Sequence, residues 1–244
     1  MSGATKGGFA LELLYRDDRV LVCLKPPGLL STDEPGGLPE RLRSELDLPA
    51  VRGVHRLDRP VGGVMVYALT RRAASDLGRQ MAEGRFHKRY LAIVRGLPEP
   101  DQGELRDWLY RDRAQRRTVP VPPGTEGGRP AALRYETLAA AEDRTLLAVE
   151  LLTGRTHQIR CQLAARGWSI VGDRKYGPPE TGAETLALWS CCLSFEHPRT
   201  GERLRFTRLP EPVPPWDGFA EGWEALSERF PTEGGTRGGR IISS

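Results

Sequence analysis

Short apolar runs, each closed by proline, glycine or charged residues, recur along the chain and constrain its fold more than any other feature. Runs of this length that are rich in valine, leucine and tyrosine are typical of strands. Strands are expected, in chain order, at residues 11–15, 20–24, 64–68, 89–94, 132–138, 145–151, 186–196 and 202–207. Many strands joined by few helices predict an α+β fold.

Helix signals are fewer, and they are local. Helices are expected at residues 38–46, from Thr70 to Gly84, at 156–166 and at 216–230. Thr70 can serve as an N-cap and Gly84 suits the position after the last turn. Residues 111–130 are rich in arginine, proline and glycine and are expected to form a long loop, which in a compact domain is usually mobile or functional.

The 244 residues are expected to form one domain over residues 11–230, between a flexible N-terminus (1–10) and a disordered glycine-rich tail (231–244). No stretch reaches the roughly 18 apolar residues that a membrane span needs. Residues 1–8 are polar and glycine-rich and lack the apolar core of a signal peptide. A cytoplasmic location is therefore expected.

The cysteines carry no metal-site pattern. Cys23, Cys161, Cys191 and Cys192 include no Cys-x-x-Cys pair and no neighbouring histidine at ligand spacing, so no zinc site is expected. We expect them to be reduced, mostly buried thiols.

Positive charge is concentrated in two parts of the chain, although the net charge is only +4. Residues 52–95 hold ten Lys or Arg against three Asp or Glu, and residues 155–175 hold five against one. This pattern is expected if both segments line one groove that holds a polyanion. The alternative is a solvated arginine-rich surface, which is the commoner meaning of a charge run.

Two segments about a hundred residues apart carry the chemistry. The first is His55-Arg56-Leu57-Asp58, and the second runs from Thr153 to Arg160. Arg160 lies on the first turn of an expected helix, where the macrodipole disfavours a cation, so it needs an anion such as Asp58 or a phosphate. Asp58, with arginines on both sides, is expected to stay ionised and to suit a nucleophile. The alternatives are a turn residue for Asp58 and a surface ion pair for Arg160.

In this order and spacing, the two segments resemble the signature pair of the RluA-like family of pseudouridine synthases. The resemblance implies that Asp58 is the nucleophile and Arg160 its ion-pair partner. Residues 87–92 resemble the family's Lys-x-Tyr-x-Ala segment, which implies that Tyr90 stacks on the target base; the alternative is a core tyrosine. Arg56 matches the residue that enters the helix stack when the uridine is flipped out.

The remaining candidate RNA-binding residues are His55, Arg155, His157 and Gln158. The two histidines are expected to orient loop backbone rather than to act as acid–base groups. Residues 14–29 resemble the family's opening strand pair with its Lys-Pro-x-Gly turn, and 167–177 resemble its Gly-Asp-x-x-Tyr-Gly element. One departure is clear. The family usually has Thr-Ser-Gly after the aspartate, where this chain has Val61 and Gly62 before Gly63, so the two hydroxyls are missing.

The resemblance implies the pseudouridine synthase fold, with a long mixed, mainly antiparallel sheet flanked by helices and crossed by a catalytic cleft. It implies a stand-alone catalytic domain without an S4 module, isomerising uridine in ribosomal or transfer RNA without cofactor or metal. Attack at the ribose C1′ or at the base C6 is left open. We expect a monomer and no membrane partner.

Two other readings remain. A catalytically silent RNA-binding relative would arise if the altered residues 61–62 misplaced Asp58. An unrelated hydrolase could use Asp58 with His55 or His157, but no Gly-x-Ser-x-Gly or His-Glu-x-x-His motif supports it. In the tail, residues 237–240 (Arg-Gly-Gly-Arg) resemble an RNA-contacting segment, or are simply a disordered end.

Overall fold

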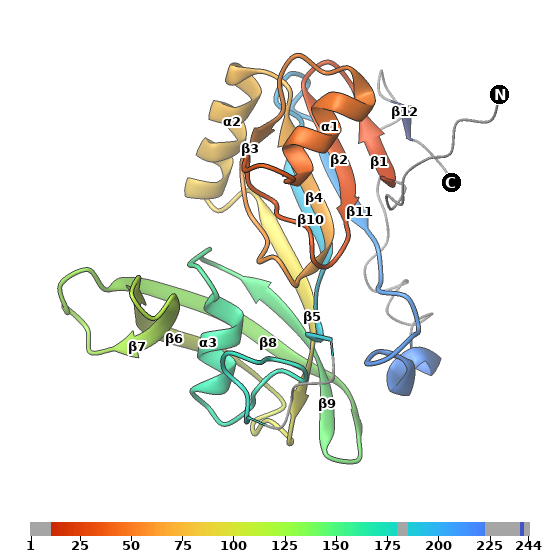
Figure 1. The fold of residues 1–244 in the computed structure, drawn as a ribbon. Coiled ribbons are helices and arrows are strands. Elements are labelled where there is room, and N and C mark those ends of the chain that lie inside the picture. Colours follow the sequence, from red (N-terminus) through yellow and green to blue (C-terminus); the bar gives the residue numbers. More distant parts are fainter. Residues whose placement is uncertain (1–10, 180–184, 223–239, 242–244) are drawn as a thin grey trace.

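The structure, a computed structural model, describes residues 11–179, 185–222 and 240–241, and one mixed sheet of twelve strands runs through them (Figure 1). The strands are β1 (Leu13–Arg16), β2 (Val20–Lys25), β3 (Arg52–Gly53), β4 (Gly62–Ala68), β5 (His87–Arg95), β6 (Gln102–Asp112), β7 (Arg117–Val121), β8 (Arg129–Ala141), β9 (Arg144–Leu151), β10 (Leu188–Glu196), β11 (Arg203–Thr207) and β12 (Arg240–Ile241). Their order is β12-β1-β2-β4-β10-β5-β9-β8-β6-β7, with β11 beside β10 and β3 beside β4.

The middle of the sheet holds the parallel pair, β4 with β10, and the other pairs in the described residues are antiparallel. The expected mixed, mainly antiparallel α+β architecture is therefore confirmed. Gly63 has φ +121°, and a Cβ there would lie 2.6 Å from the Ser190 nitrogen. Only glycine allows the two strands to approach so closely.

Three α-helices pack against the described part of the sheet. Helix α1 (Leu38–Leu46) has the predicted bounds. Helix α2 (Arg71–Ala82) is capped as predicted, because Thr70 Oγ1 accepts a hydrogen bond of 3.1 Å from the Ala73 N–H. Helix α3 (Gln158–Ala164) is shorter than predicted at both ends.

Both faces of the sheet are covered in the half that holds β1, β2 and β4, at the top of Figure 1. Alternate residues of β2 point to opposite faces, so Leu21 lies in the core cluster that includes α1, and Val22 lies in the cluster that includes α2. Helix α1 contributes Leu38 and Leu42 to the first cluster, and α2 contributes Leu77 to the second. Helix α3 packs on the lower half of the sheet (Figure 1).

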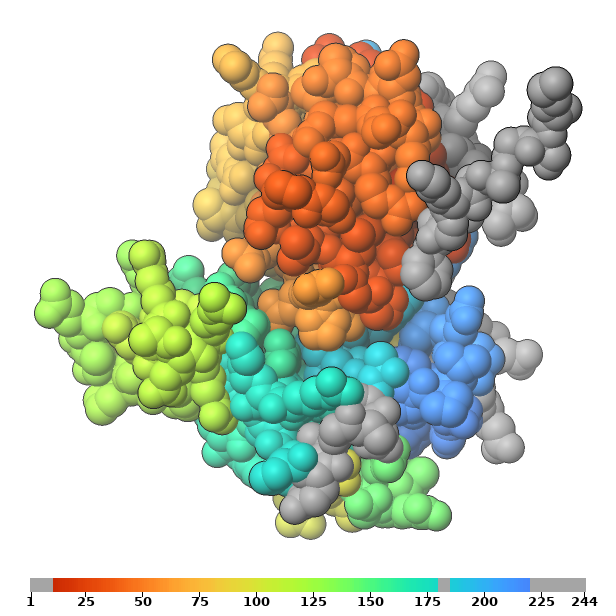
Figure 2. Space-filling view, viewed as in Figure 1, coloured from red at the N-terminus to blue at the C-terminus, as the bar shows by residue number. Residues whose placement is uncertain are grey.

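The expected single long loop over residues 111–130 is wrong, because β7 and the ends of β6 and β8 divide it into two shorter turns. We call β6, β7 and their connecting loop the arm. It projects to the left from the lower part of the molecule, beside the segment that holds α3 (Figures 1 and 2). The misprediction has a physical cause: Leu105 and Leu109 of β6 are buried, whereas Arg106 and Tyr110 on the other face are exposed. A strand with one wet face needs few apolar residues.

The structure describes only part of the C-terminal segment, so it tests only some of the predictions made there. In place of a helix over residues 216–230, the described part is a 3₁₀ turn, Asp217–Gly222, and residues 223–230 lie outside the described residues. In the tail expected to be disordered, Arg240–Ile241 pairs with β1. Residues 231–239 and 242–244, with most of the Arg-Gly segment, and the N-terminal residues 1–10 lie outside the described residues.

Candidate active site

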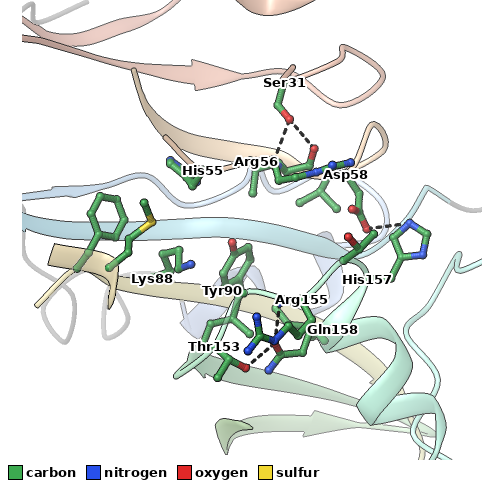
Figure 3. A pocket seen from close by; sticks show the side chains of 18 of the residues that line it. Ser31, His55, Arg56, Asp58, Lys88, Tyr90, Thr153, Arg155, His157 and Gln158 are labelled. Carbon is green, nitrogen blue, oxygen red and sulfur yellow. Dashed lines mark hydrogen bonds and ion pairs between the residues drawn. The ribbon is translucent and has the colours of Figure 1, made fainter. Parts of the chain in front are cut away.

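A cavity of about 920 Å³ opens across the middle of the sheet, between the two halves of the molecule (Figure 3). It is lined by residues 53–58 of the first chemical segment, by 150–160 of the second, and by parts of 84–90 on and before β5. The two segments predicted to share a groove are therefore brought together.

Asp58 lies in the loop between β3 and β4, with its side chain 16% exposed. Its Oδ2 accepts a hydrogen bond of 3.0 Å from Arg160 Nη1. The predicted ion pair between Asp58 and Arg160 is thus present in the structure.

A second carboxylate, Asp173, holds Arg160 from the other side. Arg160 Nε and Nη2 donate to the two oxygens of Asp173 at 2.8 and 2.7 Å. Asp173 is fully buried and also accepts the N–H groups of Lys175 and Tyr176. Burial alone would raise the pKa of Asp173, but the hydrogen bonds and charge of Arg160 lower it. This carboxylate was not among the predicted site residues, although the Gly-Asp-x-x-Tyr-Gly resemblance contained it.

His157 faces the other side of Asp58, with its Nε2 3.7 Å from Asp58 Oδ2. Its Nδ1 lies 2.9 Å from the Tyr176 hydroxyl, which accepts the Thr118 N–H of β7 at 2.8 Å. That hydroxyl accepts from Thr118 and can donate its own proton to Nδ1, an arrangement in which the imidazole proton lies on Nε2. His157 then presents an N–H to the carboxylate.

Burial keeps His157 neutral. Burial lowers its pKa to about 4, and the charge of Arg160 adds to this against the opposing effect of Asp58. The residue begins α3 in the left-handed region, at φ 54°. A non-glycine residue held there indicates that its neighbours determine the conformation. The expectation that His157 orients loop backbone stays a prediction, and the ring contact that the structure shows is with the Tyr176 side chain.

The Asp58 loop is anchored without the two missing hydroxyls. Ser31 Oγ donates to the Leu57 carbonyl at 2.7 Å and accepts the Leu57 N–H at 3.1 Å. Lys25 Nζ donates to the Arg59 carbonyl at 3.2 Å, and Val61 is buried. Side chains from the turns after β2 therefore supply the hydrogen bonds that hold this loop.

Gly62 is packed rather than loose. A Cβ on Gly62 would lie 2.8 Å from Cε3 of Trp189 and 3.0 Å from Cδ of Pro27. The Trp189 ring, whose Nε1 donates to the Arg208 carbonyl, thus fills the space of a side chain. Glycine replaces the family's serine at position 62, and the Trp189 ring occupies the space that the serine side chain would need.

Tyr90 lines the cavity from β5 and is 5% exposed. Burial, with the charge of Asp58, raises its pKa, so the hydroxyl stays protonated. His55 also lines the cavity, where its Nε2 accepts the Val66 N–H at 3.2 Å. Burial and the charge of Lys88 lower the pKa of His55 to about 3.

The other predicted RNA-binding residues divide into two kinds. Arg56 and Arg155 are exposed at the edge of the cavity. Gln158 is buried, and its amide bonds to Thr153, to the Arg155 N–H and to the Ala132 carbonyl. This residue therefore connects the loop before α3 to β8, and its contact with RNA stays a prediction.

The arrangement can perform nucleophilic chemistry. An ionised carboxylate stands in a cavity between a fixed guanidinium and a neutral imidazole, with a tyrosine beside it. Within the described residues, no group of three or more His, Cys, Asp or Glu side chains could hold a metal ion. The four cysteines are free and buried, as predicted.

Comparison with known proteins agrees with this geometry. The profile of the family described as RNA pseudouridylate synthase matches residues 19–165. The chain belongs to this family. It is 39% identical over 204 residues to the dual-specificity RNA pseudouridine synthase RluA of Escherichia coli, covering 80% of this chain and 91% of that protein. It is 35% identical to the uncharacterized RNA pseudouridine synthase YlyB of Bacillus subtilis, covering 82% and 70%.

Solved structures share the fold. Human RNA pseudouridylate synthase domain containing 1 superposes with a TM-score of 0.71 at 24% identity, covering 94% of this chain and 100% of that one. The RluA-like resemblance is therefore confirmed. The protein is an isomerase that converts uridine in RNA to pseudouridine. Among the described residues, none of the helices has the length and apolar character to cross a membrane.

Proposed function

We propose that Asp58 is the nucleophile of this isomerisation, acting on uridines of ribosomal or transfer RNA. The supporting observation is the fixed position of its carboxylate in the cavity, held by an arginine that Asp173 grips bidentately. The similarity to the E. coli relative, a dual-specificity enzyme, supports more than one RNA substrate.

Asp58 attacks the nucleotide at C1′ or C6, and the N1–C1′ bond breaks. The uracil turns within the cavity, and C5 bonds to C1′. The bond between Asp58 and C1′ or C6 breaks and returns its electron pair to the carboxylate, the C5 proton leaves and N1 takes up a proton. Arg160 holds the carboxylate, the neutral His157 offers it an N–H, and Tyr90 stacks on the uracil. Arg56, exposed at the cavity edge, fills the gap left by the flipped base.

The reaction, as proposed, requires neither cofactor nor metal, since the bonds made and broken involve only the carboxylate and the nucleotide. The working form is a monomer, and the compartment is the cytoplasm, where RNA is available and the four free thiols stay reduced. Chelation with EDTA is accordingly expected to leave the rate unchanged.

The test is tritium release from RNA labelled at uridine C5, with wild type beside Asp58→Ala. Release by wild type should fall to background in the variant, because no other group can replace the carboxylate. Arg160 keeps its bidentate pair with Asp173, so the variant is expected to fold. Asp18→Asn, an exposed carboxylate in the turn between β1 and β2, is the matched control and should release tritium normally.

Full release by Asp58→Ala would refute the nucleophile. Absence of release by wild type, with RNA binding retained, would support the silent RNA-binding relative instead.

A further inference from the structure

Lys88 lies in the cavity beyond Tyr90, on the side away from His157 (Figure 3). The two residues are two positions apart on β5, so they share a face of the sheet and stand about 7 Å apart along the strand. A Cβ placed on Gly154 would come within 3.1 Å of Lys88 Nζ. The ammonium therefore sits beside the loop that precedes α3.

Lys88 differs from the other lysines in the described residues. Lys25 Nζ donates to two backbone carbonyls, and Lys175 Nζ donates to the carbonyl of Arg116. The Lys88 ammonium has no hydrogen bond or ion pair within the described residues, and burial lowers the pKa of Lys88 with no opposing carboxylate. A partly desolvated cation without an internal anion is costly unless a ligand supplies the charge.

The neighbours of Lys88 do not supply that charge. His55 is neutral, because burial and the charge of Lys88 lower its pKa. Glu150 borders the cavity, but it is in register with Arg89, which points to the opposite face of β5, and it contacts His87. This end of the cavity is therefore positive and open to an external anion.

We propose that Lys88 binds a backbone phosphate next to the target uridine, a contact that rests on the proposed function. With the uracil on Tyr90 and its ribose at Asp58, the adjoining phosphodiester is the group with a full negative charge that the same nucleotide brings. The cavity of about 920 Å³ has room for more than one base. A phosphate satisfies a point-charge ammonium better than a neutral uracil carbonyl does.

The experiment pairs Lys88→Met with RNA that lacks a single charge. The probe is a synthetic stem–loop with one loop uridine, taken from whichever RNA releases tritium, or from transfer RNA if none does. The phosphate on either side of the uridine is replaced, one at a time, by a neutral methylphosphonate. Single-turnover tritium release and binding by fluorescence anisotropy are the two readouts.

On unmodified RNA, Lys88→Met should weaken binding by about tenfold to a hundredfold, and Lys88→Arg should retain most of it. At one of the two linkages, the methylphosphonate should weaken RNA binding by the wild-type protein by the same factor. The same replacement should leave RNA binding by Lys88→Met unchanged. The control is Arg113→Ala, which removes an exposed cation on the arm. Its loss of RNA binding should add to the loss caused by the methylphosphonate at either linkage.

Additive losses at both linkages, or no loss with Lys88→Met, would overturn the phosphate contact. Absence of turnover by wild type would instead refute the proposed function, and the binding readout would still decide the role of Lys88.

Discussion

At the scale of single residues, proton positions depend on partners from distant parts of the chain. Burial and the charge of Arg160 keep His157 neutral, and its Nδ1 lies beside the hydroxyl of Tyr176, which in turn is held by the Thr118 N–H of the arm. Asp58 can attack only while it is an ionised carboxylate, so a neutral His157 that offers N–H is more useful beside it than a group that competes for protons. The arm is thereby connected to the nucleophile.

We predict that ring ¹⁵N chemical shifts of His157 show an unprotonated Nδ1 and a protonated Nε2 throughout neutral pH. Because the folded-state pKa of about 4 lies below the ordinary 6.5, stability from this group is present above pH 6.5 and is lost as pH falls towards 4. In Tyr176→Phe the hydroxyl beside Nδ1 is lost and both tautomers should appear. Tyr110→Phe, which removes an exposed hydroxyl of the arm, is the control. A protonated Nδ1 in wild type would contradict the assignment.

At the scale of elements, the small residue at the start of β4 packs against a large residue of the neighbouring strand β10. Gly62 begins β4 and Trp189 lies in β10, where the two strands run parallel. The tryptophan ring fills the volume that a side chain at position 62 would need. Loop hydroxyls common in the family are therefore replaced by packing and by hydrogen bonds from Ser31.

Gly62→Ser is predicted to destabilise the fold by about 1–3 kcal/mol, because the new Cβ overlaps the Trp189 ring. Trp189→Leu should remove that overlap, so the double variant should be more stable than the sum of the single effects implies. Urea denaturation of wild type, the two single variants and the double variant gives the four free energies of unfolding, from which the coupling between positions 62 and 189 follows. Gly78→Ser in α2, where a Cβ meets nothing within 4 Å, is the control and should not be destabilising. Additivity within about 0.5 kcal/mol would rule out the overlap.

At the scale of the whole molecule, charge that is clustered in the sequence is only partly clustered in space. The cavity is lined by Arg56, Lys88, Arg134, Arg155 and Arg160, whereas the arginines of α2 do not line it. Exposed arginines of the arm, Arg113 and Arg116, extend the basic surface beyond the cavity. RNA bound in the cavity would run from it towards the arm.

Removal of both arm arginines, as Arg113→Ala with Arg116→Ala, should reduce the slope of log K against log salt for RNA binding by about 1.4 to 1.8. Each lost phosphate contact releases about one counterion fewer. Anisotropy titrations over a range of KCl concentrations measure the slope. Arg199→Ala, in the turn between β10 and β11, is the control and should leave it unchanged. An unchanged slope for the double variant would mean that the arm carries only a solvated surface.

The sequence by itself determined the features that depend on neighbours along the chain. The bounds of α1, the Thr70 cap and the need of Arg160 for an anion followed from local rules of propensity, capping and dipole. The tertiary structure alone decided Asp173 as the second anion, the tautomer of His157 and the isolation of Lys88. Each of these depends on which atoms meet across the sheet, and a local pattern cannot specify contacts between residues as far apart as Thr118 and Tyr176.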